Sequence, residues 1–515
     1  MTTASAGRQS PGPGDAVRQA PLAMSAATFR TLGHRLVDQL AELLESVPRR
    51  PVTRDESPSA VRDALGLTDP LPEHGMDAGV LLEQTATRLF DHSLFNAHPR
   101  FFGYITAPPA PIGILGELLA AALNPNVGAW NLAPAATEME SQTVRWIAEF
   151  IGYPIDGGGL LVSGGNMANI VCFLAARAAS ARWNVREQGV SSDSGQKLRV
   201  YASVETHTWL QKAVDLAGLG AAAIRWIPTD AKLCLDASAL RRQIETDTDN
   251  GDVPCLVVGT AGSVSTGIVD PLPDLAAICK EKSVWFHVDA AYGGFAAAVP
   301  DAPAALRALG EADSVAVDPH KWLYAPLEAG CALVREPDAL RAAFAYHPPY
   351  YHWNERATNY VDYGPQNSRG FRALKIWLAL RHVGAAGYRQ MIADDIALSR
   401  AMAAAIEAHP ELELTTQELS ITTFRYVPRD LRATTREANV ERHLDTLNRE
   451  LLDRLQRGGE AFVSNAVING RFVLRACIVN FHTTRQDVEA IPGIVARLGR
   501  TIDEELRQSG ESPRE

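Results

Sequence analysis

Three stretches of this sequence place chemically useful residues directly after short apolar runs. In the first, LLV at 160–162 leads into Ser163, Gly164, Gly165 and Asn166 and then into a helical pattern. Backbone N–H groups at a helix start bind anions, so this turn is a candidate phosphate site. The alternative is that these glycines are present only because the backbone turn is tight. The spacing fits neither nucleotide-binding fingerprint, GxxxxGK[ST] or GxGxxG, which disfavours an ATPase or a dehydrogenase.

The second and third stretches supply a carboxylate and an amine. Asp289 ends the apolar run in SVWFHVDAAYGGF and precedes small residues, including Ala291, that leave room for a ligand. A turn or capping role is its alternative. Lys321 follows SVAV at 314–317 and is flanked by His320 and Trp322. An apolar, aromatic setting lowers the pKa of a lysine and favours Schiff-base chemistry.

Together the three stretches meet the requirements of pyridoxal phosphate. Its phosphate needs backbone donors, its ring nitrogen needs a carboxylate to stay protonated, and its aldehyde needs an amine. The motifs HVDAAYGGF and DPHKW then resemble the signature of the group II pyridoxal-dependent amino-acid decarboxylases, which include aromatic-L-amino-acid and glutamate decarboxylases. HPRFFGYI at 98–105 and LRACIVN at 474–480 extend the resemblance over nearly the whole chain, from about residue 29 to 498.

The resemblance implies a role for each matching residue. Lys321 is the lysine that bonds the cofactor aldehyde, Asp289 the partner of the ring nitrogen, and His207 in VETHTW the histidine that stacks on the ring. Ser263 stands where many members have threonine, and Asp318 where some have asparagine, which questions a contact from Asp318 to phosphate. The remaining implied cofactor neighbours are Gly165, Asn166, Ala291 and His320.

A long aromatic stretch, AFAYHPPYYHWNERATNYVDYG, follows the lysine and aligns with the mobile catalytic loop of this family. Loops of this length in compact domains are commonly functional. The run AFxxxPxY places Tyr350 on the catalytic tyrosine, expected to protonate the substrate carbon after loss of carbon dioxide. Tyr346 and Tyr351 are competing assignments, and packing of these tyrosines on a partner subunit is a further alternative.

Four residues fall where the family lines its substrate pocket. Tyr104, Ile105 and Trp130 match positions that surround aromatic side chains, and such a lining favours an aromatic substrate because a buried carboxylate without a partner is costly. The alternative is that these aromatics belong to the core. Arg475 in FVLRACIV matches an arginine that holds a substrate carboxylate in glutamate decarboxylases. We therefore expect an L-aromatic amino acid, with glutamate, aspartate or 2,4-diaminobutyrate as the alternative.

The spacing of apolar residues predicts the strands and helices that would position these residues. Runs at 160–162, 200–204, 255–259, 283–290 and 314–317 alternate with helical patterns and predict a parallel or mixed sheet covered on both faces. The family resemblance implies fold type I of the pyridoxal-dependent transferases. We expect tails at 1–23 and 506–515, an N-terminal helical segment at 24–114 used for dimerisation, a large cofactor-binding domain at 115–385 and a small α+β domain at 386–505.

The composition of the chain disfavours several other classes of protein. The 49 basic and 60 acidic residues give a net charge of −11, which disfavours nucleic acid. No apolar run is long enough for a membrane span, and the six scattered cysteines form no metal-binding pattern. We expect a cytoplasmic homodimer, as in the family. An aminotransferase, a desulfurase, an oxygen-consuming aldehyde synthase and a catalytically inactive binding protein are the competing hypotheses.

Overall fold

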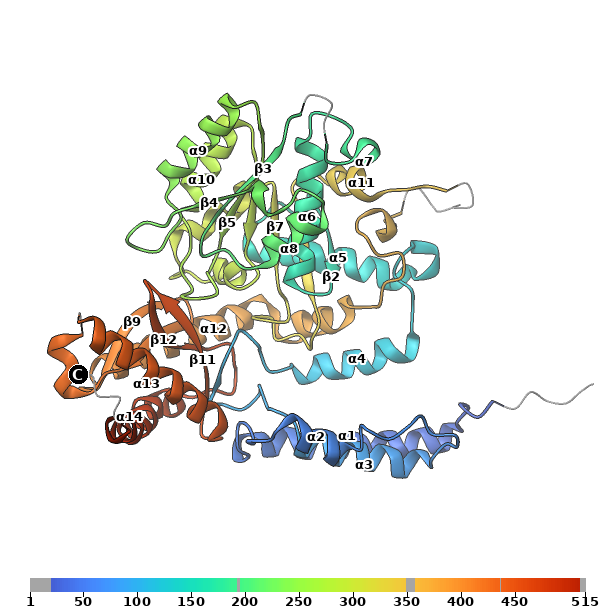
Figure 1. Cartoon of the computed structure of the whole chain (residues 1–515). Helices are drawn as coiled ribbons and strands as arrows, with labels where there is room; N and C mark the ends of the chain where they lie inside the picture. Colours follow the sequence, from blue (N-terminus) through green and yellow to red (C-terminus); the bar gives the residue numbers. More distant parts are fainter. Residues whose placement is uncertain (1–19, 192–194, 349–356, 436, 510–515) are drawn as a thin grey trace, which may run out of the picture. The chain divides into compact units, whose positions relative to one another are not determined.

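The structure is a computed structural model that describes residues 20–191, 195–348, 357–435 and 437–509 (Figure 1). The chain divides into two compact units, described separately below. The smaller contains residues 1–49 and 56–93, and the larger contains residues 50–55 and 94–515.

The smaller unit is helical. Side chains of Ser25, Ser57 and Asp77 accept backbone N–H groups at the starts of its helices, as N-cap residues do. Arg35 and Glu83 form an ion pair of 2.6 Å between the first and third helices. The elements are α1 (Ala26–Ser46), η1 (Val47–Arg49), α2 (Pro58–Leu65) and α3 (Ala78–Asp91).

A seven-stranded mixed sheet forms the centre of the larger unit, which confirms the predicted fold class. Its order is β2-β8-β7-β6-β5-β3-β4, and β8 is antiparallel to both of its neighbours. The other neighbouring strands pair in parallel. The strands are β2 (Gly158–Val162), β3 (Leu198–Ser203), β4 (Ile224–Ile227), β5 (Val253–Thr260), β6 (Trp285–Asp289), β7 (Ser314–Val317) and β8 (Gly330–Val334).

Alternate residues of these strands pack on opposite faces. Val200 and Val258 join an apolar cluster with Phe173 of α6, whereas Tyr201 and Val257 join a second cluster on the other face. Because both faces are covered, the strands are apolar almost throughout. The surrounding helices are α4 (Pro111–Leu123), η2 (Trp130–Leu132), α5 (Pro134–Ile151), α6 (Gly165–Ser180), α7 (Val185–Gln188), α8 (Trp209–Leu216), η3 (Ala221–Ala223), α9 (Ala237–Asp249), α10 (Leu272–Lys282), η4 (Gly293–Ala298), η5 (Ala304–Glu311), α11 (Asp338–Phe344) and η6 (Tyr360–Asp362).

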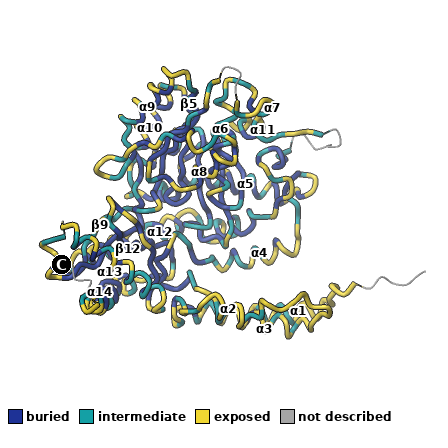
Figure 2. Tube along the Cα trace, viewed as in Figure 1, coloured by how far each residue is buried: buried dark blue, intermediate teal, exposed yellow. Residues whose placement is uncertain are grey.

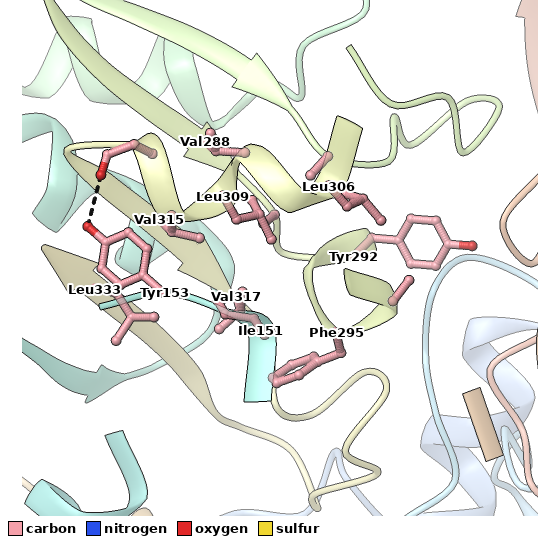
Figure 3. Packing of buried hydrophobic residues seen from close by; sticks show 14 of the residues in the cluster. Ile151, Tyr153, Val288, Tyr292, Phe295, Leu306, Leu309, Val315, Val317 and Leu333 are labelled. Atoms are coloured by element: carbon pink, nitrogen blue, oxygen red, sulfur yellow. Dashed lines mark hydrogen bonds between the residues drawn. The ribbon is translucent and has the colours of Figure 1, made fainter. Parts of the chain in front are cut away.

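The second cluster is the main core. Figure 3 shows Val288 of β6, Val315 and Val317 of β7 and Leu333 of β8 together with Leu309 of η5. The buried hydroxyl of Tyr153 in this core donates to the carbonyl of Ala312 at 3.2 Å. Figure 2 shows that the central strands are buried.

A second, five-stranded sheet lies in the C-terminal part of the larger unit. Its order is β1-β11-β12-β10-β9, antiparallel except for the short β1, which pairs in parallel with β11. The helical pattern at 440–455 forms the helix α13, whose buried leucines pack under this sheet. The elements are β1 (Phe101–Phe102), β9 (Leu412–Glu418), β10 (Ile421–Tyr426), η7 (Arg429–Thr434), α13 (Ala438–Arg457), β11 (Phe462–Ile468), β12 (Arg471–Cys477) and α14 (Arg485–Gln508).

The long helix α12 (Ala373–Glu407) packs against elements that flank both sheets: α4 and α5, and also β9 and α14. Its backbone leaves the helical conformation at Gly384, where φ is 72° and ψ is 163°. A positive φ of this kind favours glycine.

Candidate active site

The predicted cofactor residues follow strands of the large sheet that end at one edge. Strands β3, β5, β6 and β7 run in the same direction, and β2 shares it because β8 is antiparallel to both β2 and β7. Ligands of open α/β sheets bind beyond the carboxyl ends of strands. The residues placed there are Gly165 and Asn166 after β2, His207 after β3, Ser263 after β5, Asp289 and Ala291 at β6, and Asp318, His320 and Lys321 after β7.

The turn after β2 is built around two glycines. Gly164 has a φ of 100°, and a Cβ atom there would lie 3.2 Å from Cε1 of His320. A Cβ at Gly165 would lie 2.6 Å from Oδ2 of Asp318 and 3.0 Å from the methyl group of Ala291. Side chains are thus excluded where α6 begins, and α6 has no side-chain cap within the described residues. Its first N–H groups are available to an anion.

The amine of Lys321 lies beside this turn. Its Nζ is 3.1 Å from Oδ2 of Asp318, and Nε2 of His320 is 3.7 Å from the same oxygen. His320 is held by its Nδ1, 2.6 Å from the carbonyl oxygen of Ala329, and burial lowers its pKa. Oδ1 of Asp318 is buried without a hydrogen-bond partner in the described part of the chain.

Both oxygens of Asp289 accept hydrogen bonds. The indole N–H of Trp209 donates to Oδ2 at 2.7 Å, and the backbone N–H of Ala291 donates to Oδ1 at 3.2 Å. The pKa of His207 is lowered, chiefly by burial, while the charges of Asp289 and Lys321 act on it in opposite directions. Its Nδ1 accepts the backbone N–H of Trp209 at 3.2 Å. The structure therefore gathers His207, Asp289 and Lys321 in one electrostatic neighbourhood.

Ser263 is buried at the same edge, but its hydroxyl bonds within its own loop. Oγ of Ser263 lies 2.7 Å from Oγ1 of Thr266.

The predicted substrate residues divide into two groups. Arg475 on β12 donates from Nη1 to the carbonyl of Tyr104 at 3.0 Å and to the hydroxyl of Ser464 at 3.0 Å. Its Nε and Nη2 are buried without a partner among the described residues, and Arg475 is only 2% exposed. Tyr104 is 61% exposed, and Ile105 packs against the main core.

The charges of Arg475 and Lys321 both act on one buried thiol, that of Cys477. Burial raises the pKa of Cys477, and the charges of Arg475 and Lys321 both oppose that rise, so both cations lie within electrostatic reach of this thiol.

Trp130 has a different set of contacts. Its indole N–H donates to Glu138 at 2.8 Å and its backbone N–H to Asn359 at 3.1 Å. Among the loop tyrosines, Tyr346 is 70% exposed, with the guanidinium of Arg186 4.3 Å from its ring centroid. Tyr350 and Tyr351 lie outside the described residues.

Two side-chain arrangements in the site are not evident from the sequence. Nothing in the sequence shows that the indole of Trp209 reaches Asp289, although its place two residues after His207 puts it at the same sheet edge. The second is Asp395 on α12, which accepts the indole N–H of Trp322 at 3.0 Å and the hydroxyl of Tyr324 at 2.7 Å. Burial raises the pKa of Asp395 to about 7.

These residues fit pyridoxal phosphate. The glycine turn leaves space and N–H donors for a phosphate, Lys321 supplies an amine, and Asp289 supplies a carboxylate held by two donors. When bound, this cofactor supplies an electron sink for the bond that breaks at the substrate carbon.

Comparison with known proteins agrees with the site. Residues 64–427 match the pyridoxal-dependent decarboxylase conserved domain. The chain is 32% identical to an aromatic-L-amino-acid decarboxylase of Bacillus atrophaeus, covering 93% of this chain and 97% of that protein. It is 32% identical to tyrosine decarboxylase 3 of Petroselinum crispum, with 87% of each covered. The crystal structure of Catharanthus roseus tryptophan decarboxylase with L-tryptophan superposes with a TM-score of 0.84 at 27% identity, covering 94% of this chain and 100% of that one.

The chain belongs to the pyridoxal-dependent decarboxylase family. It is an enzyme of fold type I that uses pyridoxal phosphate to decarboxylate an amino acid, as the sequence predicted. Within the described ranges, no helix is long and apolar enough to cross a membrane.

Proposed function

We propose that this enzyme decarboxylates an L-aromatic amino acid to the corresponding amine and carbon dioxide. The observation that carries the proposal is the similarity over most of the chain to decarboxylases named for aromatic substrates, including tyrosine and tryptophan. The exposed ring of Tyr104, 6.2 Å from that of Phe462, offers an aromatic surface beside Arg475.

In this proposal each cofactor residue has one task. Lys321 would hold the cofactor through its aldehyde and supply the amine, Asp289 would hold the ring nitrogen, and His207 would lie against the ring. The N-terminus of α6 at Gly165 and Asn166 holds the phosphate. Asp318 cannot donate to a phosphate, so we assign it to the amine of Lys321.

A second candidate rests on Arg475. Two of its guanidinium nitrogens are buried without a partner among the described residues, and leaving such donors unpaired is costly. A carboxylate is their natural partner. The carboxylate that leaves must lose its charge, and an arginine that held it would stabilise the ground state against the reaction. Arg475 therefore favours a substrate with a second carboxylate, such as glutamate or aspartate.

One experiment separates these candidates. Carbon dioxide release is measured with each of the twenty amino acids, DOPA, 5-hydroxytryptophan and 2,4-diaminobutyrate. We expect release from aromatic amino acids. Preference for glutamate, aspartate or a diamino acid, with aromatic substrates inert, overturns the proposal and leaves the cofactor chemistry standing.

Product analysis of the same reactions separates decarboxylation from aldehyde synthesis and from transamination. A decarboxylase yields the amine with one carbon dioxide per turnover. An aldehyde synthase would consume oxygen and yield an aldehyde, and an aminotransferase would yield a keto acid without carbon dioxide. Equal amounts of amine and carbon dioxide are expected.

We further propose that the enzyme is a cytoplasmic homodimer. Helix α4 supports the dimer because it carries four exposed leucines, and clustered exposed apolar residues are typical of interaction surfaces. The free thiols, of which five are buried, support a reducing compartment. Light scattering is expected to give twice the chain mass, and a stable, fully active monomer would refute the dimer. The exposed leucines are Leu115, Leu118, Leu119 and Leu123.

A further inference from the structure

Trp209 contacts the carboxylate of Asp289 directly. It is the first residue of α8, it has no exposed surface, and its indole N–H donates to Oδ2 of Asp289 at 2.7 Å. The other oxygen, Oδ1, accepts the backbone N–H of Ala291 at 3.2 Å. Each oxygen of Asp289 thus has one donor from the protein, and a carboxylate oxygen can accept a further bond.

The indole is held in place by a buried histidine. The ring of His287 lies edge-on to Trp209, with centroids 5.7 Å apart and an interplanar angle of 85°. His287 is itself fixed from two sides, with Nε2 2.7 Å from Oδ1 of Asn169 on α6 and Nδ1 2.9 Å from Oγ of Ser314 on β7. Trp209 therefore presents its N–H in one orientation, set by α6, β6 and β7 together.

The N–H of Trp209 has a chemical consequence for a proton shared between Asp289 and a bound ring nitrogen. A donor to a carboxylate stabilises the ionised form. Because Oδ2 already accepts the indole N–H, a proton shared with a bound ring nitrogen would lie on that nitrogen. There it makes the ring a strong electron sink.

We infer that Trp209 is a positioning residue for catalysis: its indole N–H orients Asp289 and keeps the shared proton on the cofactor ring. The inference rests on the role proposed for Asp289. A tryptophan buried among Phe173, Leu198 and Leu210 also fills the core, and packing alone is the competing explanation. The two explanations differ only in the importance of the N–H group, so the test must remove that group and keep the ring.

The test uses the holoenzyme with 3-benzothienylalanine incorporated at position 209 alone. In this residue sulfur replaces the indole N–H while the ring shape is kept. Trp209→Phe is the second variant, and Trp183→Phe is the matched control, because Trp183 packs on the same apolar cluster but donates its N–H to the carbonyl of Gly189. The measurements are kcat, KM and the ¹⁵N chemical shift of the ring nitrogen of ¹⁵N-labelled pyridoxal phosphate.

We expect both position-209 variants to lower kcat by about ten- to a hundredfold, the usual effect of losing a hydrogen bond to a charged group, with KM within about twofold. The ¹⁵N shift should move towards that of unprotonated pyridine. The Trp183→Phe enzyme should match the wild type in all three measurements. An unchanged ¹⁵N shift and kcat in the benzothienyl enzyme would overturn the inference and leave packing as the explanation.

Asp289→Asn distinguishes failure of this inference from failure of the site assignment. If this change leaves the ¹⁵N shift and kcat at wild-type values, Asp289 is not the ring partner and the proposed site is wrong. If Asp289→Asn alters both measurements and the benzothienyl substitution alters neither, the site stands and only the inference on Trp209 fails. In the double variant, the loss of the N–H should add little to Asp289→Asn, because the two changes act on one contact.

Discussion

The cofactor side and the substrate side of the candidate site are built differently. Cofactor residues follow neighbouring strands of one sheet, and Asp289, Lys321 and His320 each bond to a protein group. The predicted substrate residues come from the segments before and after α4 and from β12 of the second sheet, where Arg475 keeps two nitrogens without a partner among the described residues. The residues at the sheet edge thus supply the groups that the cofactor chemistry needs. The loops and the second sheet can vary to accept different substrate side chains.

The largest expected effect comes from the cofactor side. Lys321→Ala should abolish turnover and the cofactor bond that borohydride reduces, while the far-ultraviolet circular dichroism stays unchanged. The measurement is peptide mass mapping after reduction. Lys282→Ala is the control, because Lys282 is a lysine paired with Glu245 on α9, outside the site. Reductive labelling of Lys282 or Lys375 in the wild type would contradict the assignment of Lys321.

Asp289→Asn should have the next largest effect. We expect kcat to fall by about 10² to 10³, the usual effect of removing one preorganised electrostatic contact, with pyridoxal phosphate still bound. Asp313→Asn is the matched control, since Asp313 is a carboxylate at the opposite end of the same sheet, bonded to the N–H of Phe286. Near wild-type turnover of Asp289→Asn would show that Asp289 is not the partner of the ring nitrogen.

On the substrate side, a smaller and more selective effect is expected. If the preferred substrate carries a second carboxylate, Arg475→Gln should raise its KM about tenfold or more through loss of one charge-assisted hydrogen bond, whereas the KM of an aromatic amino acid and the affinity for pyridoxal phosphate should change little. Steady-state kinetics with the preferred amino acid and a cofactor titration measure the two quantities. If the cofactor affinity falls and KM does not, Arg475 supports the fold of β12 and the two sides are less separate than proposed.

The smallest expected effect is on the pH dependence of the free energy of unfolding. It comes from Asp395, which accepts hydrogen bonds from Trp322 and Tyr324, close after Lys321 in the sequence. Burial raises the pKa of Asp395 to about 7, above its unfolded value near 4, so the folded state holds a proton that the unfolded state has lost. Asp395 should therefore contribute a fall in the free energy of unfolding as pH rises from about 4 to about 7, by at most about 1.4 kcal/mol per pH unit.

Asp395→Asn should flatten this pH dependence, because an asparagine side chain does not titrate in this range. Urea unfolding at several pH values measures it, with Glu407→Gln as the control, because Glu407 is an exposed carboxylate on the same helix. An unchanged slope in Asp395→Asn would show that another group causes the dependence.

Much of the cofactor side could be predicted because its signals are local. An apolar run followed by Asp289 or Lys321 specifies both a strand and the residue at its end, and parallel strands then bring those ends together. The antiparallel strand β8 was not foreseen, since the short run Gly330–Val334 carries no sign of its direction. The contact between Trp209 and Asp289 joins residues 80 positions apart. Such a contact depends on how α8 packs on the sheet, which sequence periodicity does not encode.

On the substrate side, matching positions to a family predicted roles for Tyr104 and Arg475 but not the geometry of these residues. The backbone of Tyr104 adopts a φ of 52°, and its carbonyl, rather than its ring, accepts the guanidinium of Arg475. That bond joins residues 371 positions apart through a loop and a strand of the second sheet. Local residue patterns cannot specify a contact of this kind.

Gly384 divides α12, the helix that packs against elements beside both sheets, into two segments. As one unbroken helix, the 35 residues of α12 would extend roughly 52 Å in a single direction. The break divides that length into two shorter rods, so each half meets its own layer at its own angle. No atom lies within 4 Å of a Cβ built at Gly384, so an alanine there would meet backbone strain of about 1 kcal/mol without a clash. Gly384→Ala should therefore cost stability through backbone strain at this bend of α12 and not through lost packing.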